Sequence, residues 1–179
     1  MVLTIDIGNT TIGIGGFQGN KLLFIEKISS RRPLSDAGYI EKLNMILNKH
    51  GLSAEAFEGS MISSVVPSVT AVFSSALETF LGRKPLILSH KLDLGYEICT
   101  EFPEKVGCDR LADIAGAISR YSLPFVTIDL GTATTFNVLD ENRRFLGGLI
   151  LPGVGTAHRA LLGKTAQLPK GDIHMPAHT

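Results

Sequence analysis

The residues best able to do chemistry lie in two copies of one short pattern. Near the N-terminus an apolar run ends in Asp6, and Gly8 follows; past the middle another apolar run ends in Asp129, and Gly131 follows. Small hydroxyl or amide residues come directly after each glycine. A carboxylate at a strand end can hold Mg²⁺, and glycine lets backbone amides approach a phosphate. The repeat therefore predicts two phosphate-binding loops.

Either pattern alone is equally compatible with an ordinary β-turn, because Gly, Asn and Asp are turn residues. Two copies, with Thr11 and Thr134 at matching offsets, favour the ligand-binding interpretation. The sequence becomes β-prone again after each glycine, so we expect hairpin turns and not helix starts. A Walker A loop is excluded because its Gly-x-x-x-x-Gly-Lys-Ser/Thr pattern is absent.

A third candidate segment, Gly107-Cys108-Asp109-Arg110, precedes the second loop. Asp109 is a candidate acceptor for a proton from a substrate hydroxyl, and Arg110 is a candidate grip on a substrate carboxylate. The structural alternative is an Asp that caps a helix beside an Arg. Its position between two phosphate-type loops favours the catalytic interpretation. Cys108 has no His nearby in sequence, so we expect a small buried residue and not a nucleophile.

Composition excludes several classes of protein. Lys plus Arg and Asp plus Glu are 17 each among 179 residues, and no basic run is present. This balance argues against a nucleic-acid or membrane surface. The start of the chain lacks a signal-peptide pattern, and no apolar stretch approaches the length of a membrane span. Two cysteines are too few for a disulfide framework, so the chain is predicted to be cytoplasmic with reduced thiols.

The pattern of apolar residues predicts strands and helices in an α/β order with mixed sheets. Residues 91–106 are expected to be irregular. The expected strands are 2–6, 12–17, 21–28, 59–66, 85–88, 125–129, 134–139 and 144–151, and the expected helices are 35–50, 67–81, 108–121 and 155–162.

The chain is expected to form two similar domains, 1–121 and 122–179. The second has three strands and one helix where the first has more, so we expect it to be incomplete at its C-terminus. His174 and His178 have the spacing of a metal pair on a helix, but Pro176 between them opposes a helix, and they are interpreted as tail residues.

The motifs around Asp6, Asp109 and Asp129, together with Gly147-Gly148-x-Ile150-x-Pro152-Gly153, resemble type III pantothenate kinase in order and spacing. The resemblance covers nearly the whole chain. It implies duplicated ribonuclease-H-like (actin-like) domains with a cleft between them, the second truncated here. It also implies ATP-dependent phosphorylation of pantothenate, the first step of coenzyme A biosynthesis. Mg²⁺, a monovalent cation (K⁺ or NH₄⁺) and a homodimer are implied as well.

Carried over by position, the resemblance gives roles to individual residues. Gly107 to Arg110 would contact pantothenate, with Asp109 as general base. Asp129 would serve the monovalent cation and Thr132 would contact an ATP phosphate, while Asp6 would hold Mg²⁺ directly or through water. The first ATP loop would comprise Asp6, Ile7, Gly8, Asn9, Thr10, Thr11, Ile12 and Gly13.

Two departures from the family pattern are visible. Thr100 stands where the family often has a substrate-contacting Tyr, and the chain stops before a Gly-x-Asn-Thr element and the elements that hold the nucleotide base. Two other functions therefore remain: a non-catalytic regulator resembling a transcriptional activator, and another actin-like phosphotransferase. The intact acidic positions favour the kinase.

Overall fold

The structure is a computed structural model that describes residues 1–164 of the chain. The chain forms two compact units, one of residues 1–94 with 102–112, the other of 95–101 with the chain from 113 onward. Each unit carries a mixed β-sheet, which confirms the predicted α/β class. The predicted domain division after residue 121 stays a prediction. His174 and His178 lie outside the described residues.

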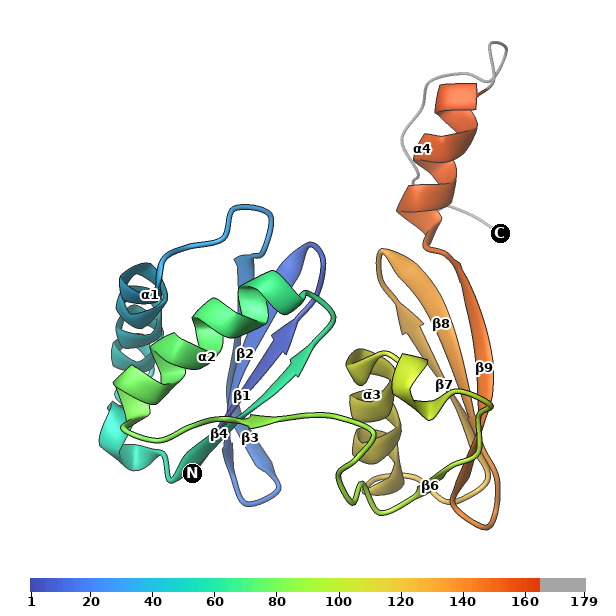
Figure 1. Cartoon of the computed structure of the whole chain (residues 1–179), viewed down its shortest axis with the longest axis horizontal. Helices are drawn as coiled ribbons and strands as arrows, with labels where there is room; N and C mark the ends of the chain where they lie inside the picture. Colours follow the sequence, from blue (N-terminus) through green and yellow to red (C-terminus); the bar gives the residue numbers. More distant parts are fainter. Residues whose placement is uncertain (165–179) are drawn as a thin grey trace, which may run out of the picture. The chain divides into compact units, whose positions relative to one another are not determined.

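The first unit is built on a five-stranded sheet in the order β3-β2-β1-β4-β5 (Figure 1). β1 lies in the centre, antiparallel to β2 and parallel to β4. The first two strands form the predicted hairpin. The bounds are β1 (Val2–Ile7), β2 (Thr11–Gln18), β3 (Lys21–Ser29), β4 (Gly59–Ser64) and β5 (Leu86–Ile87).

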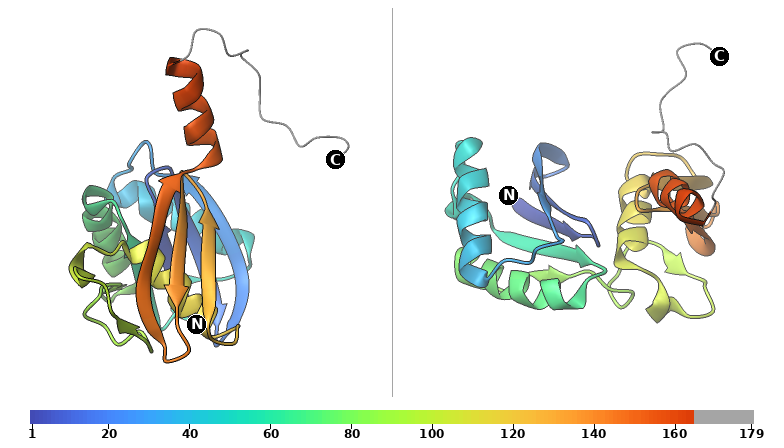
Figure 2. Two further views of the ribbon diagram at one scale, coloured as in Figure 1. Left: turned by 90° about the vertical axis from the view of Figure 1, so that its right-hand side faces the viewer. Right: turned by 90° about the horizontal axis from the view of Figure 1, so that it is seen from above.

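Two helices, α1 (Asp36–Lys49) and α2 (Pro67–Leu81), cover one face of this sheet, as Figure 2 shows from above. Ser35 caps α1, because its Oγ accepts a hydrogen bond from the Gly38 amide at 3.3 Å. The helices pack their buried side chains on alternate residues of the central strands. The core includes Leu3, Ile5, Ile7, Ile12, Ile14, Tyr39, Leu43, Leu47, Ile62, Phe73 and Leu77.

The alternation along β1 decides where its carboxylate lies. Leu3, Ile5 and Ile7 are each at most 1% exposed and belong to the core under the helices. Since successive strand residues point to opposite faces, Asp6 must point away from that core. Asp6 is indeed exposed.

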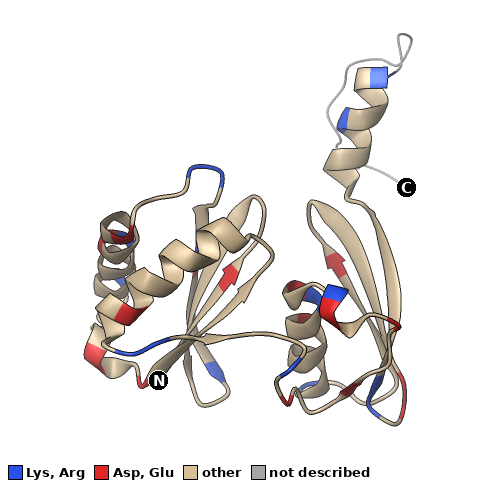
Figure 3. Cartoon of the chain, in the orientation of Figure 1, with Lys and Arg blue, Asp and Glu red and all other residues tan. Residues whose placement is uncertain are grey.

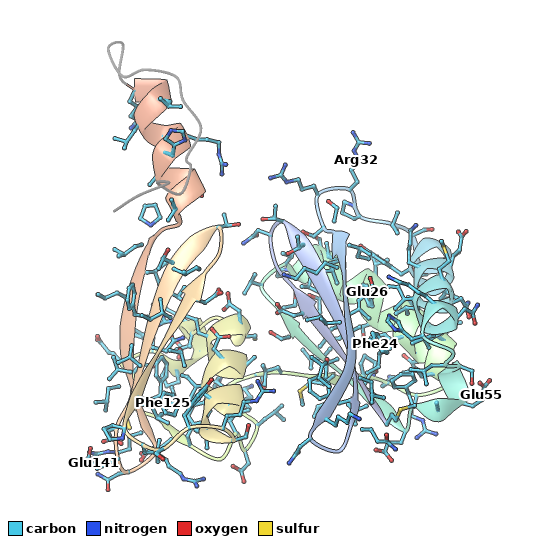
Figure 4. All side chains as sticks on the ribbon, turned by 180° about the vertical axis from the view of Figure 1, so that it is seen from behind. Phe24, Glu26, Arg32, Glu55, Phe125 and Glu141 are labelled. Atoms are coloured by element: carbon cyan, nitrogen blue, oxygen red, sulfur yellow. The ribbon has the colours of Figure 1, made fainter. Side chains whose placement is uncertain are left out.

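The far end of α1 is tied to β3 by a small polar and aromatic cluster. The His50 ring stacks on Phe24, with ring centroids 4.5 Å apart. Glu26, which is labelled with Phe24 in Figure 4, accepts a hydrogen bond from Lys49 Nζ at 2.7 Å and pairs with His50 Nε2 at 2.9 Å. These hydrogen bonds hold the pKa of Glu26 below its ordinary value. The cluster joins the C-terminal end of α1 to β3, the edge strand that pairs with β2.

The second unit has a four-stranded sheet in the order β6-β9-β8-β7. β6 and a 3₁₀ turn at Pro103–Lys105 fall in the segment predicted to be irregular. β6 is only two residues long and exists by pairing with β9, which a local pattern does not reveal. The bounds are β6 (Glu97–Ile98), β7 (Phe125–Leu130), β8 (Ala133–Leu139), β9 (Arg144–Pro152) and α4 (Val154–Lys164). The helix α3 (Cys108–Ile118) begins in the first unit and ends in the second.

The two faces of this second sheet differ sharply in burial. One face carries Thr135, Asn137 and Leu139, which are all buried. The opposite face is apolar and exposed. An exposed apolar face of this kind is typical of a surface that contacts other protein surface. Its exposed side chains are those of Val126, Ile128, Leu130, Val138, Leu149 and Leu151.

Both units carry charged residues of both signs. Figure 3 shows Lys and Arg interspersed with Asp and Glu in both units. Within residues 1–164, no helix has the length and apolar character needed to cross a bilayer.

Asp140 closes the turn between β8 and β9. Its carboxylate accepts hydrogen bonds from the amides of Asn142 and Arg144, and from Arg144 Nε at 2.8 Å. Burial alone would raise the pKa of Asp140, but these bonds and the Arg144 charge outweigh it and lower the pKa. The folded state therefore favours the charged carboxylate.

We predict that Asp140→Asn lowers the thermal midpoint at pH 7, and that this difference disappears in acid. A depressed folded-state pKa stabilises the fold above the unfolded carboxyl pKa of about 4, and the stabilisation is lost as pH falls through the folded value. Scanning calorimetry from pH 7 to pH 3 measures this. Glu141→Gln, an exposed change in the same turn, is the control and should show no such pH dependence. A pH-independent effect of Asp140→Asn would contradict the assignment.

Candidate functional site

The first predicted loop is a closed backbone turn between β1 and β2. The Gly8 amide donates to the Thr11 carbonyl at 2.9 Å, and the Ser30 amide donates to the Thr10 carbonyl at 3.1 Å. A Cβ on Gly8 would lie 3.3 Å from the Thr11 oxygen, so the turn leaves little room for a side chain there. Residues 8–10 are thus held as a compact turn at the carboxyl end of a central strand.

Asp6 lies at the same edge of the sheet, between two strands. Its partner on β2 is Gly13, where an added Cβ would lie 3.8 Å from the Asp6 Cβ. The absence of a side chain at Gly13 leaves space beside the Asp6 carboxylate. Its partner on the other side, in parallel β4, is Ser63.

Ser63 and Ser64 lie in the expected strand 59–66 and were not predicted to be site residues. Ser64 Oγ accepts hydrogen bonds from the Val66 amide at 3.0 Å and from the Thr70 hydroxyl at 2.6 Å, so it supports the start of α2. Ser63 is 8% exposed, and its Oγ has no hydrogen-bond partner within the described part of the chain. Only the strand register connects it to Asp6, and no local sequence signal reveals that register.

The Gly107–Arg110 segment lies beside the ends of β4 and β5. Cys108 Sγ donates to the carbonyl of Leu88 at 3.1 Å, just past β5. A Cβ on Gly107 would lie 3.8 Å from the Val65 side chain, and the Val65 amide in turn donates to the Ile7 carbonyl at 3.1 Å. The segment therefore lies at the edge of the sheet that Asp6 occupies.

Asp109 lies in the first turn of α3 and does not precede it, since the helix begins at Cys108. Its Oδ1 accepts a hydrogen bond from the Arg110 amide at 2.8 Å. The same carboxylate occupies the space that a Cβ on Gly107 would need. Glycine at position 107 thus allows this position of the Asp109 side chain.

Cys108 does not have the environment of a nucleophile. Burial raises the pKa of its thiol, and the nearby Asp109 charge adds to the rise, while a hydrogen bond to the Ser64 backbone lowers it in part. A raised pKa keeps the thiol protonated and unreactive. This agrees with the expectation of a structural cysteine.

The second loop joins β7 to β8 in the other unit. The Gly131 amide donates to the Ala133 carbonyl at 2.9 Å. The Thr132 carbonyl accepts from the Gly153 amide at 3.0 Å and from the Thr156 hydroxyl at 2.8 Å. A Cβ on Gly153 would clash with the backbone of the loop, so this glycine serves a tight join between β9, α4 and the loop.

The two hairpins are not identical in register, although Thr11 and Thr134 have matching sequence offsets. Ile7 pairs with Ile12, whereas Leu130 pairs with Thr134. The position equivalent to Thr134 is therefore Ile12. The turn between β7 and β8 is therefore one residue shorter than the turn between β1 and β2. The sequence does not reveal this difference, because Asp and Gly recur at the same spacing in both copies.

Two further residues lie in the second unit. The cross-strand partner of Asp129 is Thr135, which is 7% exposed and whose Oγ1 has no hydrogen-bond partner among residues 1–164. Thr100 also lies in this unit, and its methyl group is 3.7 Å from where a Cβ on Gly147 would be. A contact of Thr100 with a substrate stays a prediction.

The residues do not form a dense metal centre. Within residues 1–164, no group of three or more His, Cys, Asp or Glu side chains is placed to hold a metal ion. Mg²⁺ is usually bound through one or two carboxylates and keeps several waters. Asp6 supplies one such carboxylate, and Ser63 adds a hydroxyl on the same face.

The first unit has an open α/β sheet, with a carboxylate and a tight turn at the carboxyl end of a central strand. This arrangement is typical of ligand-binding α/β proteins. A tight glycine-containing turn at this position is compatible with binding of a phosphate. Residues 2–179 match the family described as type III pantothenate kinase. The chain belongs to this family.

Comparisons with individual proteins support this family assignment. The chain is 40% identical to a type III pantothenate kinase of Bifidobacterium animalis subsp. lactis, over 98% of this chain and 70% of the relative. It is 37% identical to one of Dictyoglomus turgidum, over 98% of this chain and 69% of the relative. A solved Campylobacter jejuni structure, described as a Baf family transcriptional activator, has a TM-score of 0.54 at 17% identity, covering 97% of this chain and 68% of that one. That similarity concerns the fold alone.

We predict that Gly107→Ala lowers kinase turnover by about 10²-fold, because the new Cβ displaces the Asp109 carboxylate and a shift of about 1 Å at a reacting group costs that much. Steady-state kinetics with thermal melting measures it. Gly116→Ala, within α3, meets nothing within 4 Å and is the control, with unchanged turnover and a slightly raised midpoint. Normal turnover in Gly107→Ala would show that the Asp109 position is not critical.

Proposed function

We propose that this protein transfers the γ-phosphoryl group of ATP to the primary hydroxyl of pantothenate. ATP-dependent pantothenate phosphorylation is the activity of the family to which the chain belongs. One observation carries the proposal to particular residues: the Gly107–Asp109 segment and Asp6 share the carboxyl edge of β1, β4 and β5. Ligands of open α/β sheets bind at that edge.

In this proposal Asp109 is the general base. The hydroxyl of pantothenate is a weak nucleophile until its proton is accepted, and a positioned carboxylate can accept it as the oxygen attacks phosphorus. Arg110, next along the helix, grips the substrate carboxylate through its planar guanidinium. Gly107 supports the role of Asp109, because glycine at this position leaves room for the Asp109 side chain.

The first loop, residues 6–13, receives the ATP phosphates. Its turn offers backbone amides, and Asn9 is exposed there. A divalent metal, taken to be Mg²⁺, would be held by Asp6, with Ser63 on the same face. When bound, Mg²⁺ neutralises charge on the phosphate oxygens. Catalysis otherwise rests on positioning and electrostatics.

In the second unit, Asp129 is proposed to serve a monovalent cation, K⁺ or NH₄⁺, and Thr132 a phosphate of ATP. Both are exposed, at the end of β7 and in the following turn. The Thr132 carbonyl accepts hydrogen bonds from the Gly153 amide and the Thr156 hydroxyl, which hold the turn in place. The two units are proposed to be duplicated ribonuclease-H-like domains. A homodimer and a cytoplasmic location complete the proposal.

The direct test is ATP turnover by the purified protein with Mg²⁺ and K⁺, with and without pantothenate, and with the phosphorylated product identified by mass spectrometry. Pantothenate-dependent ADP release with formation of phosphopantothenate is expected. ADP release that ignores pantothenate but responds to a sugar would indicate another phosphotransferase. No turnover at all would indicate a regulatory homologue.

We predict that Asp109→Asn lowers kcat by about 10²–10⁴-fold and leaves pantothenate binding nearly unchanged, because Asn cannot accept the proton. Rapid-quench and steady-state kinetics give kcat, and calorimetry gives affinity. A mutant that raises only KM would show that Asp109 binds substrate and is not the base.

Arg110→Ala is predicted to act on the other parameter. Removing the guanidinium takes away ground-state affinity, so KM for pantothenate should rise while kcat changes little. The amide analogue of pantothenate, which lacks the carboxylate, separates the causes, since it should bind wild type and Arg110→Ala alike. If wild type bound the amide analogue as tightly as pantothenate, the proposed contact between Arg110 and the carboxylate would be wrong.

A further inference from the structure

Two unpartnered buried hydroxyls lie beside the two strand-end carboxylates. Among residues 1–164, six buried side-chain polar atoms lack a hydrogen-bond partner: those of Ser30, Tyr39, Ser60, Ser63, Thr100 and Thr135. Ser63 is the register partner of Asp6, and Thr135 is the register partner of Asp129. The same juxtaposition thus occurs once in each unit.

A buried hydroxyl without a partner carries a desolvation cost, so each such group in a native fold calls for an explanation. The hydroxyl of the adjacent Ser64 has partners within the protein, because its Oγ accepts hydrogen bonds from both the Val66 amide and the Thr70 hydroxyl. Ser63 is only 8% exposed, and its hydroxyl has no hydrogen-bond partner among the described residues. Ser60 shares this lack of a partner, so what distinguishes Ser63 is its position beside Asp6 on the other face of the sheet.

The strand register shows which side chain lies beside Ser63. Adjacent strands lie about 4.8 Å apart, and register partners on parallel strands point to the same face. Ser63 therefore presents its hydroxyl on the face of Asp6, within reach of whatever that carboxylate binds. Ser60, three residues earlier on β4, pairs with Leu3 and belongs to the opposite, core face.

We propose that the Ser63 hydroxyl donates a hydrogen bond to a water of the hydrated divalent cation held at Asp6, and so positions the metal–nucleotide complex. Ser63 is a positioning residue and takes no part in the bond changes. The inference rests on the proposed function, because it requires a metal–nucleotide complex at Asp6. Thr135 is the corresponding hydroxyl beside Asp129 in the second unit.

The test is calorimetric titration of a non-hydrolysable ATP analogue, with and without Mg²⁺, into wild type, Ser63→Ala and Ser60→Ala. The measured quantity is the factor by which Mg²⁺ raises nucleotide affinity. Ser63→Ala should reduce this factor roughly three- to tenfold, the usual worth of one net hydrogen bond, with metal-free affinity unchanged. Its thermal midpoint should stay the same or rise, since an unpaired hydroxyl is removed.

Ser60→Ala removes an equally buried, equally unpartnered hydroxyl from the other face, so it should leave the Mg²⁺ factor unchanged. An undiminished Mg²⁺ factor in Ser63→Ala overturns the inference and leaves the kinase proposal intact. An equal loss of affinity with and without Mg²⁺ also overturns it, because the hydroxyl would then contact the nucleotide itself. A wild-type protein that binds no nucleotide overturns the proposed function and this inference with it.

Discussion

The strict alternation of side chains along β1 is the constraint on which the first unit depends. Leu3, Ile5 and Ile7 are buried under α1 and α2, so their strand cannot shift by one residue without exposing all three. The position between Ile5 and Ile7 must then point to the opposite face. The core fixes where Asp6 lies, and the chemistry of the site follows from the packing of apolar residues elsewhere.

The parallel partner of β1 extends this constraint to the rest of the edge. Pairing with β4 brings Ser63 beside Asp6, and the Val65–Ile7 hydrogen bond continues the pairing beyond the strand. Cys108 and Gly107 contact the ends of β5 and β4, which brings a segment about a hundred residues away to the same edge. The carboxyl edge of a parallel pair thus collects residues that the sequence scatters.

Much of this could be predicted from sequence because the signals were local. Runs of apolar residues marked β1, β2, β7 and β8. Ser63 was missed because its significance depends on strand register, and β6 was missed because two residues form a strand only through β9. The one-residue difference between the hairpins was hidden because Asp and Gly recur at the same offset while the pairing does not. The substrate was predicted only from the resemblance to type III pantothenate kinase, because the spacing of residues does not indicate a particular substrate.

The central claim is that phosphate binds at the turn after β1. Amide chemical-shift mapping with a Mg²⁺–ATP analogue tests it directly, because the β2–β3 turn around Gly19 and Asn20 lies on the same hairpin ladder and serves as an internal reference. The account predicts large shifts at Gly8, Asn9 and Thr10 and none at Gly19. Shifts that spare residues 8–10, or that are as large at Gly19, would contradict it.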